Sequence, residues 1–236
     1  MEVLRITVSA PVASFRRPLD HNYQRTLLLP PPTTLLGLAG AAWGLSEEEL
    51  WASGSPLENL KVAVWIENKP GRARDMWTVM KIKGGKIADR SPYFRELLFF
   101  PRYTLIYGGP YQLLERLHQA FLDPVYPLSL GREDEMISIQ DIALETTVSG
   151  TPLFRGTVIP GDLRQLKVRI HLQPGIRFEP PIIETLPLRF KLDRRGIRRP
   201  IQRTPLTFLP LELEVEVQDI KPVFALRGRN FTWMNS

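Results

Sequence analysis

Apolar and polar residues alternate along several short stretches of the chain, which is the pattern of half-buried β-strands. In the first of them, Leu4, Ile6 and Val8 share one face while Arg5 and Thr7 share the other. This alternation and similar strand-like stretches predict strands over residues 3–8, 60–67, 77–83, 102–107, 136–148, 168–172, 188–192 and 211–217. The chain is therefore predicted to be rich in strands.

Two stretches repeat their apolar residues at helical spacing instead. Residues 35–45 consist mainly of Leu, Ala and Gly and are apolar nearly all round, which predicts a buried helix. Thr33 or Thr34 is expected to cap its N-terminus. Residues 111–123 place large side chains every three or four positions, and this spacing predicts a second helix.

The order of these elements indicates a fold class. Over residues 1–150 the chain reads strand, helix, strand, hairpin, strand, helix, strand. Without the hairpin, this is the βαββαβ pattern of ferredoxin-like, RRM-type domains. We therefore expect an α+β protein: a ferredoxin-like RNA-binding domain over 1–150 with a β-hairpin inserted at 69–102, and a β-rich C-terminal region over 151–236 packed on it.

The inserted segment is strongly basic. Residues 69–102 contain nine Lys or Arg against three acidic residues, and Gly84-Gly85 is a two-residue hairpin signal. A basic hairpin that projects from the body is predicted. A second basic run, residues 189–203, contains seven Lys or Arg against one acidic residue, and the sequence leaves its role open.

Composition and charge limit the kind of protein and the kind of partner that the chain can have. The chain has 236 residues, is 43% hydrophobic and contains no Cys, so it can build a core but no disulfide or thiolate zinc site. No stretch approaches the roughly 18 apolar residues of a membrane span, and Glu2 and Arg5 stand where a signal peptide would be apolar. A cytoplasmic protein without membrane contact is expected. Its net charge of +6 favours a polyanion as partner.

Motifs of common enzyme classes are missing from the sequence: it has no glycine-rich phosphate loop, nucleophile elbow or histidine pair at metal spacing. No metal and no cofactor are expected. One catalytic alternative stays open, because His21 and Tyr23 lie on a basic loop. Such groups can cleave RNA without metal, one deprotonating the 2′-hydroxyl and another protonating the leaving oxygen.

Basic and aromatic residues are interleaved in two places, as in proteins that hold single-stranded RNA by its phosphates and stacked bases. One place is the long irregular stretch over residues 10–32, and the other is the inserted hairpin, whose alternative interpretation is a solvated charged arm. The candidate RNA-binding residues are Arg16, Arg17, His21, Tyr23 and Arg25 in the first loop and Trp77, Lys81 and Lys83 in the hairpin.

Several of these segments resemble a known family. The strand at residues 4–8, the Ala13-Ser14-Phe15-Arg16 turn and the stretch over 31–45, Pro-Pro-Thr-Thr-Leu-Leu-Gly-Leu-Ala-Gly-Ala-Ala-Trp-Gly-Leu, resemble the N-terminal signature of the CRISPR-associated Cas-five family. Residues 126–132, Tyr-Pro-Leu-Ser-Leu-Gly-Arg, resemble the downstream "LGR" loop of that family.

The resemblance implies a noncatalytic RNA-binding subunit of a type I, Cascade-like complex in antiviral defence, which holds the 5′ handle of crRNA. Expected partners in this hetero-oligomer are the crRNA, a Cas-seven backbone subunit contacted through the thumb-like hairpin, and a Cas-eight-type large subunit. Gly131 would let RNA approach closely and Arg132 would pair a phosphate or stack on a base. Thr33 and Thr34 would present a helix N-terminus to phosphates.

One branch of the family cleaves precursor crRNA with Tyr, Lys and His, the last two adjacent in sequence. No Lys-His pair occurs in this chain. A binding subunit without enzymatic activity is therefore expected, with metal-independent endoribonuclease activity as the alternative.

Overall fold

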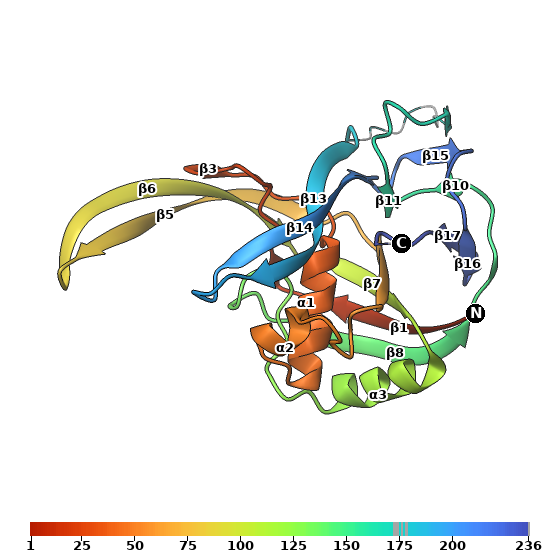
Figure 1. The fold of residues 1–236 in the computed structure, drawn as a ribbon. Coiled ribbons are helices and arrows are strands. Elements are labelled where there is room, and N and C mark those ends of the chain that lie inside the picture. Colours follow the sequence, from red (N-terminus) through yellow and green to blue (C-terminus); the bar gives the residue numbers. More distant parts are fainter. Residues whose placement is uncertain (172–174, 176, 178, 236) are drawn as a thin grey trace.

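The computed structural model describes all residues except 172–174, 176, 178 and 236. Its central element is a four-stranded sheet in the order β4-β7-β1-β8, in which every neighbouring pair is antiparallel (Figure 1). These strands are β1 (Glu2–Ser9), β4 (Lys61–Ile66), β7 (Arg102–Gly108) and β8 (Ser138–Thr146). The strands predicted over residues 3–8, 60–67, 102–107 and 136–148 are thereby confirmed, with shifts of one or two residues at their ends.

Two helices of twelve residues, α1 (Pro32–Trp43) and α3 (Tyr111–Leu122), pack against the sheet and against each other (Figure 1). Leu4, Ile6 and Val8 belong to the same core cluster as the buried leucines of both helices. A short helix, α2 (Glu47–Trp51), follows α1 and starts at a capping box. The predicted α+β class is confirmed.

The expected cap of α1 is wrong. The N-cap residue is Pro31, no side chain caps the helix, and Thr33 and Thr34 lie inside its first turn. The reason is local, because the fixed φ of proline suits the first helical position and its missing N–H is one that a helix start leaves unpaired in any case. The proline run, rather than a threonine hydroxyl, starts this helix.

The predicted basic hairpin is present and projects from the body as a long curved arm (Figure 1). It consists of β5 (Gly71–Lys83) and β6 (Lys86–Phe99), paired antiparallel along their length. Gly84 and Gly85 form the turn with φ of 58° and 75°, values that glycine adopts without strain. The stretch over 10–32 is less irregular than expected, because β2 (Val12–Ala13) and β3 (Tyr23–Gln24) pair with β6.

The C-terminal part is built of short strands and one second hairpin. That hairpin, β13 (Ile182–Leu192) and β14 (Arg198–Phe208), is longer than the predicted strand at 188–192 and contains the second basic run. The predicted strand over 211–217 begins only at Glu214, and that over 168–172 is seen to His171, since Leu172 is outside the described residues. The other strands are β9 (Val148–Ser149), β10 (Leu153–Phe154), β11 (Val158–Pro160), β12 (Val168–His171), β15 (Glu214–Val217), β16 (Phe224–Leu226) and β17 (Arg229–Phe231).

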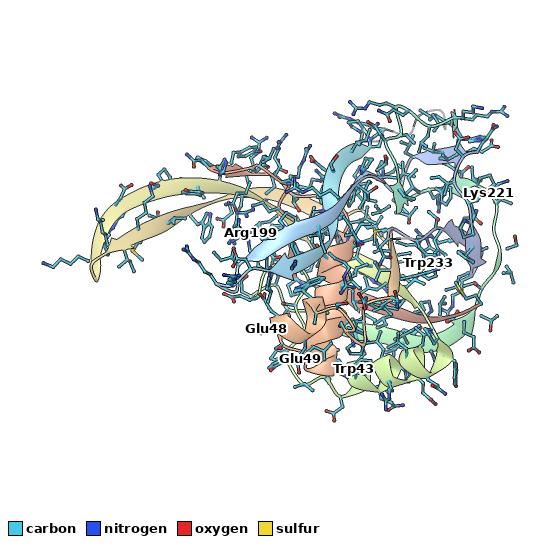
Figure 2. All side chains as sticks on the ribbon, viewed as in Figure 1. Trp43, Glu48, Glu49, Arg199, Lys221 and Trp233 are labelled. Atoms are coloured by element: carbon cyan, nitrogen blue, oxygen red, sulfur yellow. The ribbon has the colours of Figure 1, made fainter. Side chains whose placement is uncertain are left out.

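The face of the central sheet that the helices leave free is covered by the C-terminal strands. Trp65 and Ile106 of the sheet pack with Phe231 and Trp233, which are both fully buried. Figure 2 shows Trp233 in the interior of the molecule. On the same face Arg5 is only 2% exposed. Domains of the RRM type stack RNA bases on this face. In this chain that surface is covered, so it is not available to stack bases.

None of the helices among the described residues is long and apolar enough to cross a lipid bilayer.

Candidate nucleic-acid interface

A groove of about 1150 Å³ is lined by residues of the first loop, the α1 N-terminus, the β5–β6 hairpin, the 131–132 loop and the β13–β14 hairpin. Figure 1 shows the two hairpins leaving the body on the same side, β5–β6 reaching much farther. Segments far apart in sequence thus build one concave surface. Seven of the residues predicted to bind RNA line it: Arg16, Arg17, Thr33, Thr34, Trp77, Gly131 and Arg132.

Arg132 links its own loop to β3 and to β5 on the floor of the groove. Its Nη2 donates to Oε1 of Gln24 at 2.7 Å, and its guanidinium carbon lies 4.7 Å from the centroid of the Trp77 ring. Burial, and to a lesser degree the nearby Arg95, lowers the pKa of Arg132, but arginine keeps its charge in a folded protein. The side chain therefore presents a fixed cation over an aromatic ring.

The position of Arg132 is set by a buried carboxylate. Glu135 is 5% exposed and accepts hydrogen bonds from Ser14 N at 2.7 Å, Ser14 Oγ at 2.5 Å and Arg132 N at 2.9 Å. Gly131 has φ of +123°, and a Cβ there would lie 2.4 Å from the Ser14 carbonyl oxygen. Glycine is thus required by contact with the first loop, a requirement that holds without any RNA and that the sequence did not reveal.

The N-terminus of α1 opens on the same groove. The amides of Thr34 and Leu35 both donate to the Pro31 carbonyl oxygen, at 3.0 and 3.3 Å. Thr33 and Thr34 are half-buried and line the groove. A helix N-terminus carries a partial positive charge, which favours an anion at this end of the groove.

The first loop is fixed by ion pairs. Arg17 pairs with Glu184 of β13, which links the loop to the second hairpin. Arg25 binds Asp20 through Nε at 3.1 Å and Nη2 at 2.8 Å, and this hydrogen bonding lowers the pKa of Asp20. Arg25 lies outside the groove residues and serves the loop's own structure.

His21 and Tyr23 also lie outside the groove residues. His21 is exposed. The hydroxyl of Tyr23 donates to Oε1 of Glu96 at 2.8 Å, and this bond raises the pKa of Tyr23. A tyrosine with a raised pKa is a poorer base at neutral pH. The structure does not bring the two candidate catalytic side chains into the groove.

The two predicted lysines of the hairpin lie near its far end. Lys81 and Lys83 are exposed, and Lys81 Nζ is 3.2 Å from Oδ2 of Asp89. Neither belongs to the groove residues, whereas Trp77, nearer the body, does. The hairpin thus contributes to the groove through Trp77, Val79 and Tyr93, which lie along the middle of its two strands.

One wall of the groove consists of the β13–β14 hairpin, to which the sequence alone assigned no role. Its second basic run was visible in the sequence, but only tertiary contacts place this run beside the first loop. Arg198, for example, pairs with Glu47 of α2 and reaches the groove from β14. The groove residues that the sequence reading missed include Arg164, Phe190, Arg198 and Arg203.

Positive charge is concentrated in the two hairpins. Residues 69–102 and residues 189–203 each carry a net charge of +6. Because the whole chain carries +6, the remaining residues together carry −6. The two hairpins are therefore basic arms of a chain whose other residues carry a net negative charge, and such a distribution favours a polyanion near the hairpins.

Comparisons with known proteins agree with this geometry. The model of the family described as "CRISPR-associated protein (Cas_Cas5)" matches residues 3–192 of the chain. A solved structure of a "CRISPR RNA-guided surveillance complex" aligns with a TM-score of 0.56 at 17% identity, over 88% of this chain and 91% of that one. A CRISPR protein from Archaeoglobus fulgidus aligns with a TM-score of 0.58 at 14% identity, over 98% of each chain. No curated protein matches the chain in sequence. The two structural likenesses show a shared fold.

Proposed function

Because the chain belongs to the CRISPR-associated Cas-five family, we propose that its groove holds the 5′ handle of crRNA in a type I, Cascade-like surveillance complex. The observation that carries this proposal is the groove itself. It combines the guanidinium groups of Arg16, Arg132 and Arg203 with the rings of Trp77 and Tyr93. Cations for phosphates and planar groups for bases are what single-stranded RNA requires.

The fold supports the same proposal. The sheet order β4-β7-β1-β8, with two helices in the connections, is the strand order expected of a ferredoxin-like βαββαβ domain. We assign residues 1–150 to this arrangement, with β5–β6 inserted between its second and third strands. The closed sheet face accounts for a site built from loops and hairpins.

The β5–β6 hairpin supports a protein partner as well as RNA. Side chains alternate along its strands, so the face opposite Trp77 and Val79 is turned away from the groove. That face carries large apolar side chains that are 45 to 71% exposed, and they are Met76, Met80, Ile82, Ile87 and Phe94. Several large apolar side chains exposed on one face are typical of a protein interface. We assign it to the Cas-seven backbone subunit, with the Cas-eight-type large subunit as a further partner.

RNA binding by the purified chain tests the proposal. A labelled single-stranded RNA of the repeat sequence should bind with an affinity that falls steeply with salt. For about six neutralised phosphates, the log–log slope is about −4, a loss of a few hundredfold between about 50 and 200 mM salt. Fluorescence anisotropy over that range measures the slope. Affinity that is absent, or independent of salt, would contradict the proposal.

Metal-independent cleavage of precursor crRNA is the second candidate function. It is favoured only by the presence of His21 and Tyr23 on one loop. The two side chains lie outside the groove, and Tyr23 is hydrogen-bonded to Glu96, so the geometry favours binding without cleavage.

We therefore expect that labelled repeat RNA incubated with the protein in EDTA stays intact over hours. A denaturing gel reads the outcome, and His21→Ala serves as the matched variant. Cleavage that the wild type performs and His21→Ala does not would establish the ribonuclease instead.

A further inference from the structure

Leu19 stands out among the described residues by its conformation and its exposure. It has φ of 66°, a left-handed value that costs a leucine about 1 kcal/mol or more, and its side chain is 92% exposed. Pro18 and Leu19 form the corner of a turn. Proline followed by a residue of positive φ is the pattern of a type II turn, whose third position favours Gly or Asn. The chain has leucine where glycine would cost less.

The other non-glycine residues with positive φ in the described part of the chain have structural explanations. Arg227 precedes Gly228 in the tight turn between β16 and β17. Gln202 lies where the β13–β14 ladder skips a pair. Phe100 is the corner between β6 and β7, where its amide donates to the Pro11 carbonyl oxygen at 3.0 Å. No strand or buried contact accounts for a leucine at position 19.

The turn at Leu19 is held rigidly from both sides. On one side, Arg17 pairs with Glu184 and its amide donates to the Arg25 carbonyl oxygen at 3.0 Å. On the other side, Asp20 is bound by Arg25 through its backbone and its guanidinium. The side chain of Leu19 is thus displayed at a fixed position rather than on a loose loop.

That fixed position is the groove, which Leu19 lines together with Arg16 and Arg17. We propose that Leu19 is an RNA-contacting residue whose side chain packs against the face of one unpaired base held in the groove. The inference rests on the proposed function of the groove and adds an apolar contact to it. Nucleobase faces are apolar, while the arginines beside Leu19 suit the phosphates on either side. The strain is retained because the contact exists only when RNA is bound.

The test compares the effects of one substitution on stability and on RNA affinity. Leu19→Gly removes the strain together with the side chain, so the free energy of unfolding should not fall, while the affinity for single-stranded RNA should drop about tenfold. Leu19→Met, which keeps an apolar side chain, should bind RNA within about threefold of the wild type. Urea denaturation and fluorescence anisotropy with a labelled repeat RNA of about ten nucleotides measure the two quantities.

Phe100→Gly is the matched control, because Phe100 is also strained and 70% exposed but does not line the groove. It should leave RNA affinity unchanged. The inference is overturned if Leu19→Gly binds RNA as well as the wild type does, or if it lowers stability and affinity together. Wild-type protein that binds no RNA would refute the proposed function instead, so the two failures are distinguishable.

Discussion

Replacing three groove arginines with glutamine, Arg16→Gln, Arg132→Gln and Arg203→Gln together, should lower the affinity for repeat RNA about hundredfold at about 100 mM salt. The three side chains enter the groove from the first loop, the 131–132 loop and β14. Each is expected to neutralise one phosphate of a single strand, so the log–log salt slope should become less steep by about 2. Fluorescence anisotropy across a salt series measures both changes.

The control removes the same charge outside the groove. Lys81, Lys83 and Lys86 are exposed near the far end of the β5–β6 hairpin, and their joint replacement with glutamine also lowers the net charge by three. This variant should bind within about threefold of the wild type and keep its salt slope, because none of the three side chains lines the groove. An equal loss in both variants would mean that net charge, and not the groove, attracts the RNA.

The elements predicted from the sequence and those in the structure agree where local pattern decides them. Strands with alternating residues, the helix over Tyr111–Leu122 and the turn at Gly84-Gly85 were predictable, because each is decided by neighbours within a few residues. The basic–aromatic character of the first loop and of Trp77 was visible for the same reason. Local pattern therefore predicted the elements and, with Arg16, Arg17 and Trp77, part of the groove lining.

Contacts between segments far apart in the chain could not be predicted from the sequence. The groove wall from β13–β14 depends on the Arg17–Glu184 ion pair, whose residues are 167 positions apart, and on the hydrogen bond from Arg189 to Leu50 of α2, whose residues are 139 positions apart. Lys81 and Lys83 were predicted with Trp77 because they are its neighbours in sequence, yet a strand rises about 3.3 Å per residue and carries them away from the groove. The buried role of Glu135 was hidden in an acidic run that looks solvated.

A second large effect should follow from Arg5→Ala, which should lower the free energy of unfolding by about 3 to 5 kcal/mol at neutral pH. Arg5 is 2% exposed and binds Glu145 at 2.6 Å and Asp141 at 2.7 Å on the covered face of the central sheet. Without it, the carboxylate of Glu145 is left partly buried beside the remaining Arg227. Denaturation in guanidinium chloride measures the loss.

Lowering the pH should narrow the difference between the two proteins. Burial opposes ionisation of Glu145, but hydrogen bonds from Arg5 and Arg227 outweigh it and lower the pKa of this carboxyl, while Arg5 lowers the pKa of Asp141. A carboxyl whose pKa is lowered by folding stabilises the protein above its unfolded pKa, near 4, and loses that contribution as pH falls through the folded value. The wild type should therefore lose more stability than Arg5→Ala between about pH 5 and pH 3.

Arg227→Ala provides the control for burial, because Arg227 contacts the same Glu145 from an exposed position at 2.6 Å. Its removal should cost less than about 1 kcal/mol, as for other exposed ion pairs. Equal costs for the two arginines would contradict the view that burial makes Arg5 indispensable. Neither variant should change RNA affinity by more than about twofold, because the covered sheet face is not where a groove between the two hairpins would hold RNA. A large loss of RNA affinity in Arg5→Ala, with the fold intact, would return the binding site to the sheet.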